Sequence, residues 1–443
     1  MHEKSTLSTL IESAQILVGE QLHTVHILLE NGKIKKISKS RTIQAGNKIN
    51  AKGLIALPGL IDAHVHLRDM ELSYKETFET GTQAAAAGGF TTVIDMPNTK
   101  PPTISSVRLD EKKAKAQGRL FANIAFQGAL IQDPNELRQM KEHGAIAFKL
   151  YLNKALETFD SADDVQLRRA FLSAKEAKAL VTVHAEDGDA IRNHQQASIR
   201  AGKTSFDAFL RAHPPKSEVK EVRRILKLST ELAVRVHICH TSVPAAVRYI
   251  RRAHGATCEA TPHHLFVNHS IFKKQGSFAI CVPPIRSEQD RSGLWRCFKK
   301  GQIDILASDH APHTIEEKAQ DVWKAASGIP GLETSLPLLL TQFSRGTLSL
   351  RRLIYATSTL PAKIFHLSNK GRLEEGFDAD IVLVDPKAET TINAANFLSK
   401  AKYSPFDGMR CKGAVAYTIL NGEVVAQNGN IVGSSNGRVV RGQ

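Results

Sequence analysis

The sequence predicts an α/β fold, a (β/α)8 barrel of the TIM type with a small β-sandwich domain built from both ends of the chain. Between residues 53 and 365, eight short runs rich in apolar and β-branched residues alternate with amphipathic stretches, which is typical of parallel βα units. Residues 1–52 and 366–443 instead alternate apolar and polar residues over short runs, as antiparallel strands do. A chain of 443 residues has room for a barrel of about 250 residues and one further domain.

The eight apolar runs are expected to be the barrel strands, because eight parallel strands close a barrel of this kind. They are Leu54–Val65, Thr91–Met96, Phe121–Leu130, Ala145–Leu152, Leu180–Ala185, Val234–His240, Thr257–Ala260 and Ile303–Ser308. Between and after them, apolar stripes at helical spacing predict helices. The clearest are Lys75–Ala87, Ser106–Gln117, Glu218–Ser229, Pro330–Phe343 and Leu348–Ile364.

Both ends of the chain carry hairpin signals. Asn31-Gly32 and Asn421-Gly422 each separate two runs of strand character, and this dipeptide favours a two-residue hairpin turn. Because the two ends share this pattern, we expect them to pair into one β domain beside the barrel. The last residues, Gly433–Gln443, are rich in Gly, Ser and Arg and are expected to form a loose tail.

Composition narrows the functional classes. The net charge is +15, but the basic residues are spread along the chain without interleaved aromatic residues, so nucleic acid is not expected as a partner. No apolar run of about 18 residues predicts a membrane span, and no signal peptide is evident, so a cytoplasmic location is expected. An odd number of scattered cysteines predicts free thiols. They are Cys239, Cys258, Cys281, Cys297 and Cys411.

Metal-ligating residue types follow several of the predicted strands. These residues are His64, His66, Lys149, His184, His240 and Asp309. Catalytic groups of (β/α)8 enzymes come from the C-terminal ends of different strands, so these side chains are expected to meet. His64 and His66 alone would also fit two histidines that only pack at a strand end. The further residues at neighbouring strand ends favour a metal site.

Two of these residues predict specific chemistry. Lys149 stands alone in an apolar run, where burial favours an uncharged amine that can take up CO₂ and bridge two cations as a carbamate; the alternative is a lysine that extends to the barrel mouth. Asp309 can ligate a metal and transfer protons, although a helix N-cap is the common role at such a turn. His237 and Cys239 alternate with His240 and are expected to face away from the site.

With these residues in place, the chain resembles the amidohydrolase superfamily, and within it the dihydroorotase family of the animal type with a bridging lysine. The resemblance covers residues 53–365. The motifs that carry it include Gly59-Leu-Ile-Asp-Ala-His-Val-His-Leu-Arg, Met96-Pro-Asn-Thr, Phe148-Lys-Leu-Tyr-Leu-Asn, Val183-His-Ala-Glu, Val236-His-Ile-Cys-His, Cys258-Glu-Ala-Thr-Pro-His-His-Leu, Ala307-Ser-Asp-His-Ala-Pro-His-Thr and Pro330-Gly-Leu-Glu-Thr.

The resemblance implies a zinc-dependent, reversible hydrolysis of dihydroorotate to N-carbamoyl-aspartate in pyrimidine biosynthesis. It implies two zinc ions, one held by His64, His66 and Asp309 and the other by His184 and His240, with carboxylated Lys149 between them. Asp309 would be the catalytic acid and base. The anionic substrate would be held by Arg68, Asn98 and His313, and His264 would touch the second zinc or the substrate. A homodimer is expected, with aspartate transcarbamoylase as a possible partner.

The chain also departs from the family pattern. Val282 stands before Pro-Pro where the family usually has Asn or Arg, and Ala155 and Leu156 replace the Thr-Phe pair of the loop after the fourth strand. Three readings therefore stay open. They are a dihydroorotase, an allantoinase or other cyclic amidase, and a non-catalytic scaffold for aspartate transcarbamoylase.

Overall fold

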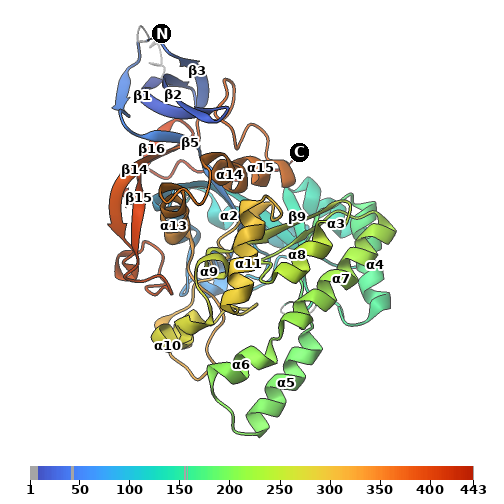
Figure 1. Ribbon diagram of the computed structural model, residues 1–443. Helices are drawn as coiled ribbons and strands as arrows, with labels where there is room; N and C mark the ends of the chain where they lie inside the picture. Colours follow the sequence, from blue (N-terminus) through green and yellow to red (C-terminus); the bar gives the residue numbers. More distant parts are fainter. Residues whose placement is uncertain (1–7, 41–43, 154–155, 157, 443) are drawn as a thin grey trace.

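A computed structural model, which describes residues 8–40, 44–153, 156 and 158–442, contains an eight-stranded parallel sheet and a nine-stranded mixed sheet (Figure 1). The parallel sheet is the barrel, and its strands are neighbours in chain order from β6 to β13. They are β6 (Leu60–Val65), β7 (Phe90–Asp95), β8 (Asn123–Ala129), β9 (Ala145–Tyr151), β10 (Val181–His184), β11 (Val236–Ile238), β12 (Ala256–Ala260) and β13 (Ile305–Leu306). Each overlaps one of the predicted runs, so the predicted barrel is confirmed.

The first and last barrel strands are joined just beyond β13. The backbone N–H of His66 donates to the carbonyl of His310 at 2.8 Å, beside a parallel bridge between β6 and His310. Buried Asp62 on β6 accepts hydrogen bonds from the backbone N–H groups of His64 and Ser308 at 3.1 and 3.0 Å. These contacts hold the end of β6 against the segment that follows β13, and both segments carry site residues.

Helices cover the outside of the barrel, and several begin with a side chain that caps the first turn. Thr77, Asp133 and Asp163 cap α1, α3 and α4 in this way. The α-helices are α1 (Phe78–Ala87), α2 (Ser106–Ala116), α3 (Pro134–Glu142), α4 (Asp164–Glu176), α5 (Gly188–Arg200), α6 (Phe206–Ala212), α7 (Pro215–Leu232), α8 (Pro244–Ile250), α9 (Pro262–Phe266), α10 (Phe272–Gln275), α11 (Glu288–Lys299), α12 (Ile315–Lys318), α13 (Leu332–Ser344), α14 (Leu350–Ile354) and α15 (Leu360–Ile364). Short 3₁₀ turns lie at Met70–Leu72, His269–Ile271, Gly276–Ala279 and Ala394–Asn396, and a π-helical turn, Tyr355–Thr359, joins α14 to α15. Within the described ranges, no helix has both the length and the apolar character needed to cross a membrane.

The mixed sheet combines both ends of the chain, as the sequence predicted. Its strands are β1 (Ser8–Val18), β2 (Gln21–Glu30), β3 (Lys33–Ser38), β4 (Asn47–Asn50), β5 (Ile55–Pro58), β14 (Ile381–Thr391), β15 (Arg410–Leu420), β16 (Glu423–Gln427) and β17 (Asn430–Ile431). The strands belong to one continuous sheet, in which β5 lies between β1 and β14. Buried Ile11, Ile27, Ile381 and Ile419 from the two ends share one hydrophobic cluster. Figure 1 shows this domain at the opposite end of the molecule from α5 and α6.

The prediction of one continuous strand over residues 54–65 is wrong. Strand β5 pairs with β14 in the mixed sheet, while β6 pairs with β7 in the barrel, and Gly59 lies between them. A Cβ atom at Gly59 would lie 2.1 Å from the Oγ1 atom of Thr91, so only glycine allows this close approach. We propose that residues 53–365 form the barrel domain and that β5, near its start, connects this domain to the mixed sheet.

The prediction of a loose C-terminal tail is also wrong for the described residues up to 442. The tail runs along the start of β8, where the N–H of Val440 donates to the carbonyl of Ile124 at 2.8 Å and the N–H of Ile124 donates to the carbonyl of Arg438 at 2.9 Å. The start of β8 has backbone groups that an extended segment can pair with. Composition alone does not reveal such a partner.

Candidate metal centre

The six predicted ligands come together at one end of the barrel. His64 lies on β6, Lys149 on β9 and His184 on β10, while His66, His240 and Asp309 lie just beyond β6, β11 and β13. Their side chains are all largely buried, and the most exposed, that of Asp309, is 13% exposed. The barrel therefore gathers metal-ligating groups from five different strands, as expected from the strand-end pattern.

The first group is built around the Asp309 carboxylate. Its Oδ1 atom lies 3.2 Å from Nε2 of His64 and 3.1 Å from Nε2 of His66. The Nδ1 atom of His66 is 2.7 Å from Oδ1 of Asn98, so Asn98 orients this ring. Two imidazole nitrogens and a carboxylate oxygen converging on one point are a donor set that suits a transition metal.

The second group consists of His184 and His240. Nδ1 of His184 lies 2.9 Å from Nε2 of His240, and Nε2 of His184 lies 3.1 Å from a carboxylate oxygen of buried Glu186. The Nδ1 atom of His240 is buried without a hydrogen-bond partner in the described residues. The His240 ring centroid is 5.3 Å from that of His64, so the two groups are neighbours. A buried, unpartnered imidazole nitrogen is the form in which histidine binds a metal.

Lys149 lies among these groups with 2% of its surface exposed. Its Nζ atom is 2.9 Å from Sγ of Cys239 and 5.1 Å from the ring centroid of Tyr151. The expectation that Cys239 faces away from the site is therefore wrong. Strand β11 ends at Ile238, and His240 has a φ of 34°, so strand alternation no longer applies at these two residues.

Glu259 on β12 connects the two groups, and the sequence reasoning missed it. Its Oε1 atom lies 2.5 Å from Nδ1 of His64 and accepts a hydrogen bond from the backbone N–H of His240 at 3.1 Å. Its Oε2 atom lies 3.0 Å from Nε2 of His237, which is therefore a supporting residue, as its strand position predicted. A carboxylate inside the predicted barrel strand Thr257–Ala260 was the sequence signal that could have drawn attention to Glu259, which the structure shows to be fully buried.

The electrostatics of the site favour a cation. Burial and the Lys149 ammonium oppose protonation of His64, but the Asp309 and Glu259 carboxylates outweigh them and raise the pKa of His64 to about 10. Burial lowers the pKa of His66 to about 4. Burial of Asp309 opposes its ionisation, yet His64 and His66 hold the pKa of this carboxyl well below its usual value. Neutral His66 and ionised Asp309 are the metal-binding forms, and a metal cation would replace the extra proton on His64.

Arg68 is a buried cation beside this centre. Its Nη2 atom lies 3.2 Å from Nε2 of His313, and its Nε atom donates to the carbonyl of Pro312 at 3.3 Å. Among the described residues, no carboxylate lies within 4 Å of its guanidinium group, although the side chain is only 8% exposed. A buried guanidinium without an anionic partner is unfavourable unless a ligand supplies the charge. Arg68 and His313 therefore lie together, and their role in binding an anion stays a prediction.

The two ring nitrogens of His264 contact Thr261 and Pro283, and its expected contact with the second zinc or the substrate stays a prediction. Its Nδ1 atom lies 2.8 Å from Oγ1 of Thr261, and its Nε2 atom lies 3.0 Å from the carbonyl of Pro283. Of the departures noted in the sequence, Val282 packs against a hydrophobic cluster. Leu156 is half-buried, and Ala155 lies outside the described residues.

Tyr151 is a further residue that the sequence reasoning missed. It follows Lys149 by two positions on β9 and so shares its face. Its hydroxyl is buried and has no hydrogen-bond partner in the described part of the chain. The spacing from Lys149 could have identified it.

Known proteins match the chain over nearly its full length. The model of the amidohydrolase family matches residues 55–425. The chain belongs to the amidohydrolase family. The dihydroorotase of Halobacterium salinarum is 40% identical over 87% of this chain and 89% of its own. The dihydroorotase of Methanothermobacter thermautotrophicus is 37% identical over 94% of each chain.

A solved relative confirms the fold of this amidohydrolase. The L-hydantoinase from Arthrobacter aurescens superposes with a TM-score of 0.94 at 34% identity, over 98% of this chain and 99% of that one. The predicted membership in the superfamily, the resemblance to dihydroorotases and the enzyme class are thus confirmed. The buried histidine and aspartate groups of the amidohydrolase can bind metal.

Proposed function

We propose that this amidohydrolase is a dihydroorotase, which reversibly hydrolyses the ring amide of dihydroorotate to N-carbamoyl-aspartate in pyrimidine biosynthesis. Its likeness to dihydroorotases over nearly the whole chain supports this activity. The observation that carries the substrate choice is Arg68, a buried guanidinium without a carboxylate partner beside the candidate metal centre. Dihydroorotate has a carboxylate that would supply this partner.

We infer that two zinc ions bind, one to His64, His66 and Asp309 and one to His184 and His240, with carboxylated Lys149 between them. The converging donor atoms of the first group and the unpartnered Nδ1 atom of His240 fit such a site. Bound zinc would supply Lewis acidity, which polarises a carbonyl and eases deprotonation of water.

The protein residues perform the remaining steps of the proposed reaction. Arg68, Asn98 and His313 hold the substrate carboxylate beside the site. The oxygen of one water bonds to the carbonyl carbon, the ring C–N bond breaks, and the nitrogen takes a proton. The Asp309 carboxylate accepts a proton from this water and delivers it to the nitrogen. The Tyr151 hydroxyl donates to the carbonyl oxygen as negative charge develops there.

The proposal is tested on protein purified without chelator, by counting metal ions per chain and following dihydroorotate hydrolysis by ultraviolet absorbance. Turnover together with at least two zinc ions per chain would support it. Arg68→Met should raise KM for dihydroorotate much more than KM for a ring without a carboxylate. Surface Arg168→Met is the matched control, because its partner is the exposed Glu231. Equal effects of Arg68→Met on both substrates would exclude Arg68 as the carboxylate-binding residue.

A second candidate is hydrolysis of another cyclic amide, such as a hydantoin or allantoin. The overall likeness to an L-hydantoinase and the apolar Val282 before Pro283 favour this alternative. The ratio of kcat/KM values for dihydroorotate, hydantoin and allantoin distinguishes the candidates. A metal-free protein inactive on all three, even after zinc is added, would favour the scaffold role.

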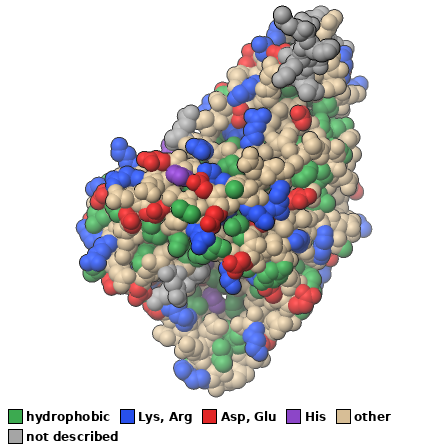
Figure 2. Space-filling model, turned by 180° about the vertical axis from the view of Figure 1, so that it is seen from behind, with side chains coloured by type: hydrophobic (Ala, Val, Ile, Leu, Met, Phe, Trp, Pro, Cys, Tyr) green, Lys and Arg blue, Asp and Glu red, His purple; other side chains and the backbone are tan. Residues whose placement is uncertain are grey.

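We also propose a cytoplasmic homodimer, with aspartate transcarbamoylase as the candidate protein partner. Lys and Arg side chains are interspersed with Asp and Glu on the face shown in Figure 2, despite the net charge of +15. This arrangement supports a small-molecule enzyme more than a nucleic-acid-binding protein. Sedimentation of the chain, alone and mixed with aspartate transcarbamoylase, tests both associations.

A further inference from the structure

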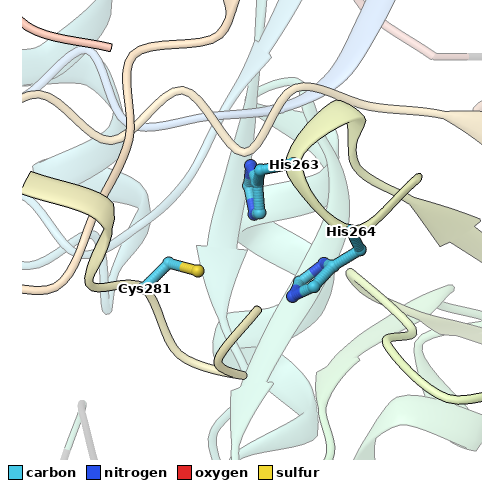
Figure 3. A group of neighbouring side chains, drawn as sticks. All are labelled: His263, His264 and Cys281. Carbon is cyan, nitrogen blue, oxygen red and sulfur yellow. The ribbon is translucent and has the colours of Figure 1, made fainter. Parts of the chain in front are cut away.

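A second group of metal-ligating side chains lies outside the centre described above. His263 and His264 lie on α9, which follows β12, and Cys281 lies just after the 3₁₀ turn Gly276–Ala279. Figure 3 shows the Cys281 sulfur directed toward the two imidazole rings. One potential ligand atom from each residue lies within 4.8 Å of the other two, and the group shares no residue with the six predicted ligands. We propose that His263, His264 and Cys281 form an additional site for Zn²⁺.

Burial makes this group unlike a chance cluster on the surface. His263 and Cys281 are each 2% exposed, and His264 is 3% exposed. The Nε2 atom of His263 has no hydrogen-bond partner in the described residues. A buried polar atom without a partner is unfavourable, and coordination of a cation would remove this penalty. The unpaired nitrogen is therefore evidence for a ligand that is independent of the clustering.

His264 can join the site by exchanging its ring proton between nitrogens. Its Nε2 atom now lies 3.0 Å from the carbonyl of Pro283, and its Nδ1 atom lies 2.8 Å from Oγ1 of Thr261. A threonine hydroxyl both donates and accepts, so Thr261 can pair with either tautomer. With the proton on Nδ1, His264 would donate to Thr261, lose its hydrogen bond to the carbonyl of Pro283 and present Nε2 to the metal. Such a hydrogen bond on the far nitrogen is usual for metal-binding histidines.

Cys281 would contribute the thiolate that selects the metal. Its Sγ atom lies 3.3 Å from the carbonyl oxygen of Pro283 and can donate a hydrogen bond to it. The Nζ atom of Lys318 donates to the carbonyl of Ile280, directly before Cys281, at 2.9 Å. Burial nevertheless raises the pKa of the Cys281 thiol to about 12, and Lys318 opposes this rise only in part. The thiolate, which is the form of cysteine that binds metals, would therefore form as the metal binds and a proton is released.

The donor set favours zinc over the oxygen-seeking cations. One sulfur and two imidazole nitrogens suit Zn²⁺, whereas Mg²⁺ and Ca²⁺ require oxygen ligands. Zinc bonds of about 2.0–2.3 Å to nitrogen and sulfur would require the most distant donors to approach by about 1 Å. Three protein ligands leave the fourth position of a tetrahedral zinc ion open to water or to a further ligand.

The test uses Co²⁺ as a spectroscopic probe in the full-length protein after chelator treatment and dialysis. Thiolate bound to Co²⁺ produces a near-ultraviolet charge-transfer band that histidine and carboxylate ligands do not. The wild type should show this band and bind one more Co²⁺ per chain than Cys281→Ser. His263→Gln should lose the same ion while keeping Cys281. This second variant keeps the test valid if Cys281→Ser folds poorly.

Two matched variants complete the test. Cys411→Ser changes a buried cysteine in the mixed sheet and should leave the spectrum and the metal count unchanged. Cys239→Ser should also keep the band, although Cys239 lies beside Lys149. Loss of the band in Cys239→Ser but not in Cys281→Ser would assign it to the main centre and overturn the proposal. Equal metal counts and spectra in the wild type, Cys281→Ser and His263→Gln would overturn it as well. None of these results depends on whether dihydroorotate is hydrolysed.

Discussion

Replacing Glu259 with glutamine tests whether this buried carboxylate sets the affinity of the metal centre. Glu259 contacts His64 through Oε1 at 2.5 Å and His237 through Oε2 at 3.0 Å. Glutamine has nearly the same shape, and its amide oxygen can still accept from His64. Its NH₂ group can donate to His237, which then gives its own proton to Thr257. The substitution therefore removes the charge and keeps the packing.

The expected magnitude follows from the contact that loses its charge. A hydrogen bond to a charged group contributes about 1.5–3 kcal/mol and a neutral one about 0.5–1.5 kcal/mol. The difference of about 1–1.5 kcal/mol corresponds to roughly a tenfold change in affinity. Loss of the partner that orients a metal-binding histidine typically weakens metal binding by about 10–100-fold. We therefore expect Glu259→Gln to bind zinc at least about tenfold more weakly than the wild type.

The assay is a competition titration of zinc against a chromophoric chelator, with circular dichroism to verify folding. Glu221→Gln is the matched control, because Glu221 is also buried but pairs with Arg224 on the outer helix α7. The control should bind zinc like the wild type. A folded Glu259→Gln protein with zinc affinity within twofold of the wild type would refute the role assigned to Glu259.

Three further predictions follow from the site and its surroundings. Lys149→Ala should abolish hydrolysis and lower the zinc content by at least one ion per chain relative to the wild type by elemental analysis, because it removes the group proposed to bridge the two ions of the main centre; an active variant with the zinc content of the wild type would contradict the bridge. Tyr151→Phe should lower kcat by about 10²-fold with little change in KM or zinc content, since it removes a donor to the developing oxyanion, and an unchanged kcat would remove Tyr151 from the mechanism. Burial raises the pKa of Glu333 from 4.5 to about 7. The folded protein therefore binds this proton more tightly than the unfolded chain, which stabilises the native state at low pH. This contribution to stability is lost as the pH rises from about 4.5 to 7. Glu333→Gln should therefore raise Tm at pH 8 relative to the wild type but not at pH 4, and equal Tm shifts at both pH values would argue against this titration.

The sequence predicted the barrel, because the signals for it are local. Strand β9 and its neighbours are short apolar runs separated by amphipathic helices, and their order along the chain is also their order in the barrel. The Asn31-Gly32 and Asn421-Gly422 turns likewise form the hairpins expected of them, with all four residues at positive φ. The ligands His64 and His66 could be predicted to share a face because strand geometry repeats every two residues.

Contacts between segments far apart in the sequence could be identified only from the tertiary structure. Glu259 lies 195 positions from His64 in the chain, yet its side chain contacts that imidazole, and no local pattern predicts this pairing. Cys239 enters the centre because the backbone leaves strand geometry at the end of β11. His263 and His264 carry the same chemistry, but the folded chain places Thr261 and Pro283 against one ring and leaves a buried nitrogen of the other unpaired. The sequence alone thus determined which helices and strands form and which side chains stand at the ends of the strands, since these depend on residues close together in the chain. The packing of segments far apart in the chain decided which polar atoms are satisfied and which remain available to a ligand.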